Sequence, residues 1–236
     1  MPVSAQAGKY SAILMDAATG RILHSEAADQ KRYPASLTKM MTLYLAFDAL
    51  KAGKLKPGQK LKISSRAASQ APSKLGLVPG KTISVENAIL ALTTKSANDA
   101  AVVLAEAIAG SEKAFAERMT RKARQLGMTA TVFQNASGLP NFRQVTTARD
   151  IATLSRALIR SHSRYYHYFS RTSFSWNGRT HTNHNRLLGH YPGADGLKTG
   201  YIDASGFNLA ASAIRGKKRL ICVVFGGPSG SWRDEK

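Results

Sequence analysis

The chain has 236 residues, of which 43% are hydrophobic, and its formal net charge is +20. This length and composition predict a globular protein with a sizeable core, built as one large domain or two small ones. No run approaches the roughly 18 uninterrupted apolar residues of a membrane-spanning helix, which excludes a span within the given residues. The single cysteine, Cys222, excludes an intramolecular disulfide, and its apolar neighbours predict a buried small hydrophobic residue.

The charge arises from 34 lysines and arginines against 14 acidic residues. Such an excess favours anionic partners, among them nucleic acid, acidic lipid headgroups and acidic wall polymers. The basic residues are scattered, however, and we find neither zinc-finger spacing nor an aromatic RNA-recognition signature. We therefore predict no nucleic-acid partner, and we interpret the densest cluster, 215–219, as a hairpin turn between two strands.

In chain order, the first predicted elements are two short strands within 11–26, joined by a turn at 18–20. Helical patterns dominate the middle of the chain and predict helices at 37–51, 85–94, 99–109, 112–126 and 147–160. The segments 54–63 and 75–85 contain Pro-Gly turns and are expected to form extended pairs.

Strand patterns return in the last third. Asn177-Gly178 divides an alternating segment and predicts a hairpin. Three further strands are expected at 196–202, 206–214 and 219–227, and their short connections require antiparallel pairing. We therefore expect an α/β fold in a single domain, 1–236. Its antiparallel sheet would come from about 8–30 and 170–230 and be flanked by helices, with a mainly helical subdomain inserted at about 35–165.

One stretch suggests chemistry: P-A-S-L-T-K-M-M-T, residues 34–42. Ser36 and Lys39 share a face if a helix begins near Ala35. A serine hydroxyl attacks a carbonyl efficiently only when a neighbouring base accepts its proton. Lys39 can serve only when neutral, and burial together with a second cation such as Lys198 would lower its pKa. The tetrapeptide alone also fits an ordinary serine at a helix start.

Two further motifs make the chemical interpretation specific. Ser96-Ala97-Asn98 lies at the junction of two predicted helices, and Lys198-Thr199-Gly200 lies within a predicted strand. The ordered set S-x-x-K, S-x-N, K-T-G is typical of penicillin-binding proteins and class A β-lactamases. A rival S-x-N, Ser175-Trp176-Asn177, is better interpreted as a strand that leads into the Asn-Gly turn.

With the flanking S-A-N-D-A-A, D-G-L-K-T-G-Y and V-V-F-G-G, nearly the whole chain resembles low-molecular-weight penicillin-binding proteins of the D-alanyl-D-alanine carboxypeptidase type. The resemblance implies a serine β-lactamase/DD-peptidase-like fold. It also implies a serine-type D,D-carboxypeptidase that removes terminal D-alanine from peptidoglycan stem peptides through an acyl-enzyme, without a cofactor or a metal. β-Lactams would acylate the same serine.

The resemblance also assigns roles to the motif residues. Ser96 would carry the proton between Lys39 and the leaving amine, and Asn98 would hold the substrate backbone. The strand with Thr199 and Gly200 would pair with the substrate, and the Thr199 hydroxyl would reach its terminal carboxylate.

Further expectations concern the oxyanion hole, a carboxylate-binding arginine and two histidines. The backbone N–H groups of Ser36 and Tyr201 would form the oxyanion hole. Arg233 matches an arginine implicated in binding the terminal carboxylate, the alternative being a solvated charge. His181 and His184 lack a third metal ligand and are interpreted as polar surface or cleft wall. Some family members have an arginine at about the position of His184, which leaves its role open.

Three alternatives stay open: a D,D-endopeptidase acting on cross-links, a class A-like β-lactamase, and a non-catalytic basic protein that binds the wall or nucleic acid. Class A enzymes need a glutamate between the second and third motifs to activate water. This chain has none between Glu117 and Glu235. We interpret Asp150 as a first-turn helix carboxylate and Asp99 as a helix cap.

The family implies an extracytoplasmic location, in the periplasm or on the wall side of the inner membrane. We expect a cleaved signal, a C-terminal β domain and a membrane anchor, none of which the given residues contain. The expected partners are stem peptides ending in D-Ala-D-Ala, β-lactams as covalent inhibitors, and anionic wall or membrane surfaces.

Overall fold

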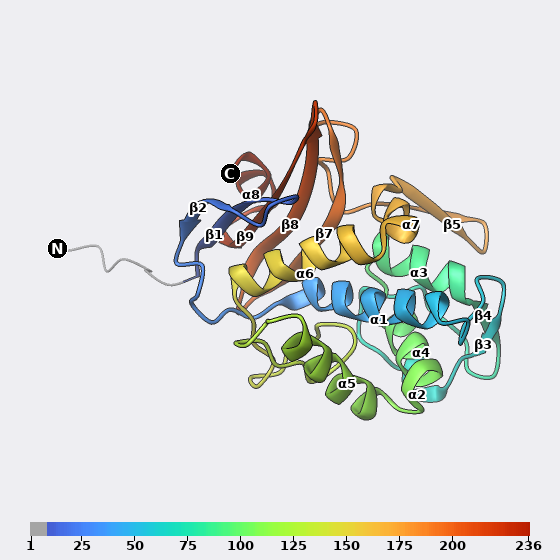
Figure 1. Cartoon of the computed structure of the whole chain (residues 1–236). Coiled ribbons are helices and arrows are strands. Elements are labelled where there is room, and N and C mark those ends of the chain that lie inside the picture. The colour runs from blue at the N-terminus through green and yellow to red at the C-terminus, as the bar shows by residue number, and fades with distance from the viewer. Residues whose placement is uncertain (1–8) are drawn as a thin grey trace.

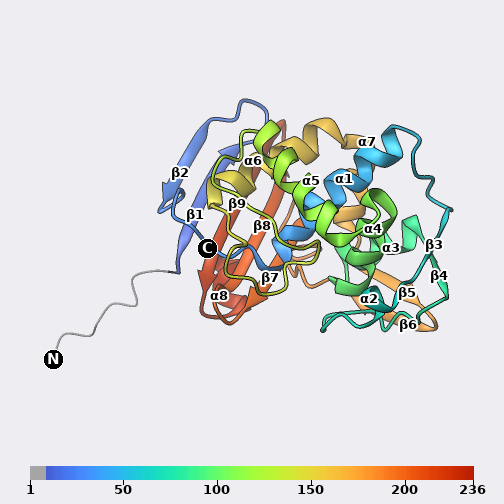
Figure 2. The ribbon, with the colours of Figure 1, turned by 90° about the horizontal axis from the view of Figure 1, so that it is seen from below.

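The computed structural model describes residues 9–236 and shows a sheet on one side of the molecule and a cluster of helices on the other (Figures 1 and 2). The sheet has five antiparallel strands in the order β2-β1-β9-β8-β7. Their bounds are β1 Ser11–Asp16, β2 Ile22–Glu26, β7 Ala194–Ile202, β8 Gly206–Arg215 and β9 Lys218–Gly227.

The first and last strands of the described chain pair with each other inside this sheet. β1 pairs with β9 so that Ser11 lies opposite Phe225 and Asp16 lies opposite Leu220. Alternate residues of β9, including Ile221 and Val223, are buried on one face, as the two-residue period of a strand requires. The helix α6 (Ala148–Ser161) runs along the sheet in Figure 1 and contributes its own apolar side chains to this core.

The helical lobe is arranged around α1 (Lys39–Lys51), whose side chains are buried on nearly all sides. A helix that is apolar all round must be enclosed by other elements. The helices α3 (Val85–Thr93), α4 (Asn98–Ala109), α5 (Glu112–Gln125) and α6 pack against α1, and α2 (Ser65–Ala68) packs against α4 (Figure 2). Among the described residues, no helix combines the length and the apolar character needed to cross a membrane.

The five predicted helices agree with the observed ones within one or two residues. At the first of them, a 3₁₀ turn, Ala35–Thr38, precedes α1. The two expected extended segments pair as β3 (Lys60–Lys62) and β4 (Thr82–Ser84), and α2 between them was not predicted. The remaining short helices are α7 Ser163–Tyr166, the 3₁₀ turn His167–Ser170, and α8 Gly230–Glu235.

The sheet was expected to resume at about residue 170, and this boundary is wrong. β5 (Ser173–Trp176) and β6 (Arg179–Thr182) form the predicted hairpin around Asn177, but they pair only with each other. Phe174 on β5 is buried in the shared hydrophobic core, so the hairpin packs against the helical part rather than extending the sheet.

Asp99 does not occupy the N-cap position of α4, which is Ala97, but its carboxylate accepts from the Ala100 N–H of the first turn at 2.9 Å. The buried carboxylate also accepts hydrogen bonds from the backbone N–H groups of Leu75, Gly76 and Leu77, at 3.1, 2.9 and 3.0 Å. It thereby fixes the loop that leads from α2 to β4, and this loop borders the cleft described below.

We expect Asp99→Ala to lower the free energy of unfolding by about 2–4 kcal/mol, because several backbone donors would lose a charged acceptor in a buried site. Urea denaturation followed by circular dichroism measures the change. Asp29→Ala is the matched control, since that carboxylate forms an exposed ion pair with Arg149 and should contribute less than about 1 kcal/mol. Equal effects of the two variants would contradict the role of Asp99.

Candidate active site

The turn before α1 brings Ser36 and Lys39 together. In a 3₁₀ turn, residues three apart lie directly above one another, so the side chains of positions 36 and 39 meet. Lys39 Nζ lies 3.0 Å from Ser36 Oγ. The contact that the spacing predicts is therefore present, and the hydroxyl has a basic group within hydrogen-bond reach.

Lys39 is fully buried and has two further oxygen neighbours. Its Nζ lies 2.7 Å from Asn98 Oδ1 and 2.5 Å from the Ser137 carbonyl oxygen. Asn98 Nδ2 donates to the Ala71 carbonyl at 2.8 Å, which fixes the amide with its oxygen toward Lys39. Both neighbours can only accept, so a neutral amine would give them its two N–H groups. Its lone pair would then face the Ser36 hydroxyl.

The surroundings favour that neutral form. Burial, followed by the positive charge of Lys198, lowers the pKa of Lys39 well below its ordinary value, while the Asp99 carboxylate acts in the opposite direction. Lys198 is itself buried and donates to the Thr199 carbonyl at 2.9 Å. Burial, and then the charge of Arg233, lowers the pKa of Lys198 to about 7.

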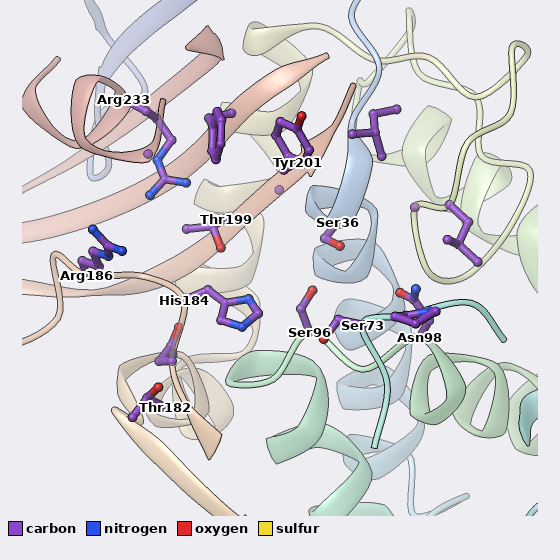
Figure 3. Close-up of a pocket in the computed structure, with 18 residues that line it drawn as sticks. Ser36, Ser73, Ser96, Asn98, Thr182, His184, Arg186, Thr199, Tyr201 and Arg233 are labelled. Atoms are coloured by element: carbon purple, nitrogen blue, oxygen red, sulfur yellow. The ribbon is translucent and has the colours of Figure 1, made fainter. Parts of the chain in front are cut away.

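Ser96 lies between α3 and α4 and is directed into the same space as Ser36 (Figure 3). Its backbone has φ +60°, a left-handed conformation that is uncommon for serine. Its Oγ is buried and has no hydrogen-bond partner within residues 9–236. A buried hydroxyl without a partner is costly, so this group is available to a ligand that enters the cleft.

A cleft of about 510 Å³ separates the sheet from the helical lobe, and both parts line it. Thr199, Gly200 and Tyr201 of β7 form one wall. A Cβ atom on Gly200 would lie only 3.0 Å from the Ser36 nitrogen, so glycine permits β7 to touch the nucleophile turn. The two segments that carry the expected oxyanion donors are therefore in contact.

Arg233 and His184 also face this cleft (Figure 3). Arg233, on α8, is buried and donates through Nε to Asp234 at 2.9 Å, so the alternative of a solvated charge is wrong. Partial burial against the cleft wall, and then the charges of Lys198 and Lys95, lower the pKa of His184 to about 4. His184 is consequently a neutral imidazole at neutral pH, whereas an arginine there would be a cation.

Residues 2–229 match the peptidase family S11, described as D-alanyl-D-alanine carboxypeptidase. The chain belongs to this family. It is 39% identical to the D-alanyl-D-alanine carboxypeptidase DacD of Escherichia coli K12, covering 100% of this chain and 62% of that protein. It is 37% identical to DacF of Bacillus subtilis 168, covering 92% and 57%. The chain thus spans about three fifths of the length of these relatives.

Solved structures agree with the assignment to the S11 family. The D-alanyl-D-alanine carboxypeptidase DacD from Francisella tularensis superposes with a TM-score of 0.93 at 32% identity, covering 95% of this chain and 67% of that one. Penicillin-binding protein D2 from Listeria monocytogenes, in its ampicillin-bound form, gives 0.83 at 32% identity, with coverages of 95% and 92%. The DD-peptidase-like fold class expected from the sequence is therefore confirmed.

One contact of this S11 site could not be predicted from the sequence. The Ser137 carbonyl contacts Lys39 through the backbone, which no side-chain motif encodes. The glycine at the next position, Gly138, is the one sequence clue to this contact. It has φ +89°, and a Cβ there would lie 1.9 Å from the Ala35 oxygen, so only glycine fits against the nucleophile turn. Ser73, Leu139 and Arg186 also line the cleft.

Cys222 is half-buried rather than buried, and desolvation raises its pKa to about 11, so its thiol stays protonated.

We expect the rate of serine acylation to rise with pH, because only the neutral amine of Lys39 accepts the proton. Lys198→Met should move this rise to higher pH, since removing a neighbouring cation makes protonated Lys39 easier to form. Stopped-flow acylation by a chromogenic cephalosporin between pH 5 and 10 measures the profile. The two lysines titrate as a coupled pair, so the apparent pKa belongs to both.

Lys39→Arg is the companion variant, because arginine stays charged throughout this range, and we expect it to lose acylation by at least about 100-fold. A flat pH profile for the wild type, or an active arginine variant, would contradict the role of Lys39 as base.

Proposed function

We propose that this chain is a serine-type D,D-carboxypeptidase that removes the terminal D-alanine from peptidoglycan stem peptides. The observation that carries the proposal is the contact of Ser36 Oγ, at 3.0 Å, with a buried amine whose pKa is lowered. The names of the relatives support the substrate class. The cleft also supplies cationic and hydroxyl groups suited to a peptide that ends in a carboxylate.

Substrate binding would use the edge of β7. The extended end of the stem peptide would lie along this strand and exchange backbone hydrogen bonds with it. Its terminal carboxylate would meet the Thr199 hydroxyl and the guanidinium of Arg233, which lie on the same side of the cleft (Figure 3). The scissile carbonyl would then be beside Ser36, where Gly200 keeps the strand close.

Catalysis would proceed in two halves. Ser36 Oγ attacks the carbonyl carbon, its proton passes to Lys39 Nζ, and the backbone N–H groups of Ser36 and Tyr201 stabilise the oxyanion. Collapse breaks the peptide bond, and the D-alanine nitrogen takes up the proton from Lys39 through the Ser96 hydroxyl. An ester on Ser36 remains. Water then attacks this ester and gives a proton to Lys39. As the bond between the acyl carbon and Ser36 Oγ breaks, Lys39 returns this proton to Oγ, and the shortened peptide leaves as the acid.

The cleft does not favour a class A β-lactamase. Among the described residues that line it there is no aspartate or glutamate to activate water. Asp150 lies in the first turn of α6, as expected, and accepts from the Thr131 hydroxyl at 2.6 Å. A penicilloyl group on Ser36 would therefore be hydrolysed slowly. The D,D-endopeptidase alternative uses the same residues, and cleavage of a cross-linked muropeptide would separate the two peptidases.

The location and the remaining partners are part of the same proposal. A peptidase for cell-wall peptides would act outside the cytoplasm, facing the wall. The net charge of +20 suits association with anionic wall polymers or acidic membrane surfaces through long-range attraction. Such association should weaken as salt rises, because screening acts over about 8 Å at physiological ionic strength.

A fluorescent penicillin should label the wild-type protein at one site, and Ser36→Ala should remain unlabelled because the nucleophile is gone. Gel fluorescence together with intact mass spectrometry reports the stoichiometry. Ser175→Ala, which alters the rival S-x-N triplet on the exposed hairpin, is the control and should label normally. Equal labelling of Ser36→Ala would end the proposal, and an absence of labelling in the wild type would favour a non-catalytic binding protein.

The penicillin adduct should persist for many minutes, whereas a peptide ending in D-Ala-D-Ala should release D-alanine with repeated turnover. Mass spectrometry follows the adduct, and a coupled D-amino acid assay follows the product. Rapid loss of the adduct, catalytic hydrolysis of benzylpenicillin and no release of D-alanine would identify a β-lactamase instead.

A further inference from the structure

A second cleft, of about 400 Å³, adjoins the catalytic cleft and is lined by aromatic side chains. Tyr201 and Phe207 line both clefts, so the two spaces are neighbours that share these side chains as a common wall. Tyr10 and Trp232 form the far part of the second cleft. These four aromatic residues come from the start of the described chain, from β7, from β8 and from α8, and they are called the aromatic cleft below.

The rings of the aromatic cleft are not explained by core packing. Tyr201 and Phe207 have ring centroids 4.4 Å apart, and Tyr10 and Trp232 meet edge to face at 5.5 Å. None of the four is fully buried, and Tyr201 is 51% exposed. Partly exposed rings that gather in a concave site are typical of ligand binding, because covering them removes apolar surface from water.

Polar groups lie among these rings. Asp203 accepts a hydrogen bond from the Tyr201 hydroxyl at 2.7 Å, and its backbone carbonyl accepts from Lys9 Nζ at 3.0 Å. Aromatic faces next to a carboxylate and an ammonium suit a pyranose ring. The C–H face of such a sugar packs against aromatic carbon, while its hydroxyl and amide groups need hydrogen-bond partners.

The amino end of a stem peptide bound along β7 would point toward the aromatic cleft. If the terminal carboxylate lies at Thr199 and the scissile carbonyl lies by Gly200, the amino end of the peptide continues past Tyr201 toward Asp203. An extended peptide advances about 3.3 Å per residue, so each four residues of a bound stem cover about 13 Å. Four residues also separate Thr199 on β7 from Asp203, which follows the strand and lines the aromatic cleft.

We propose that the aromatic cleft binds a sugar ring of the glycan strand to which the stem peptide is attached. The inference rests on the proposed carboxypeptidase function, because it treats the glycan as the continuation of the same substrate. Trp232 and Tyr10 would hold the sugar, while Tyr201 and Phe207 would guide the peptide from one cleft to the other. The protein would consequently distinguish stems on glycan from free peptides.

The test compares two substrates of identical peptide sequence, one free and one linked to an N-acetylglucosamine–N-acetylmuramic acid disaccharide. The wild type should show a higher kcat/KM for the sugar-linked peptide. Trp232→Ala and Tyr10→Ala should each reduce this preference about three- to tenfold, since a lost aromatic contact has this order of magnitude. Trp232→Phe should retain more of the preference than Trp232→Ala, because a smaller ring remains.

Tyr191→Ala is the matched control. Tyr191 is also an exposed aromatic residue with a cation over its ring, Arg215, as Trp232 has Lys236, but it lies outside both clefts. This variant should keep the wild-type preference. Equal kcat/KM for the two substrates in the wild type, unchanged in Trp232→Ala and Tyr10→Ala, would overturn the sugar site and leave the proposed function intact. Failure of the wild type to cleave either substrate would instead overturn the proposed function.

Discussion

The buried amine of Lys39 is the point on which the rest of this structure depends. Three segments far apart in the sequence place an oxygen within 3.0 Å of it, namely the nucleophile turn, the start of α4 and the loop before α6. A buried ammonium without a counter-ion is strongly unfavourable, whereas a neutral amine between hydrogen-bond partners is tolerated. The packing that closes the helical lobe over Lys39 thus lowers the pKa of its amine, which keeps the amine neutral and able to accept a proton.

The site also requires the edge strand of the sheet, β7, to lie beside the Lys39 amine. β7 is held in place by a sheet whose centre joins the first and last strands of the described chain, β1 and β9. Lys198 lies on this edge strand, and its positive charge adds to the effect of burial in lowering the pKa of Lys39. The reactive pair and the substrate-binding strand therefore belong to different parts of the fold, and the cleft exists only when both are assembled.

The sequence predicted most of this arrangement because the longer helices, the hairpin and the contact between Ser36 and Lys39 each depend on residues that are close together in the chain. Helical periodicity located the five longest helices, and Asn177-Gly178 located a hairpin, since both depend on nearby residues. The S-x-x-K spacing placed Ser36 beside Lys39 for the same reason. The partner of a strand is a tertiary property, which is why the pairing of the β5–β6 hairpin only with itself was not foreseen.

The less predictable features of the site are backbone contacts and burial. The acceptors of Lys39 include a carbonyl of Ser137, and Asp99 binds N–H groups from a loop about 23 residues away, neither of which side-chain identity reveals. The burial of Arg233 likewise depends on how α8 packs against β8 and β9. Sequence spacing could identify the reacting groups, but not the surroundings that set their protonation.

The most direct test of the account is the titration of Lys39 itself, observed by NMR through ¹³C-labelled lysine side chains and assigned with a Lys39→Arg variant. The account predicts a Lys39 resonance that titrates well below the ordinary lysine range and moves upward in Lys198→Met. A resonance that titrates at or above about 10.4, the value of an unperturbed lysine, would show that Lys39 remains an ammonium and cannot accept the Ser36 proton.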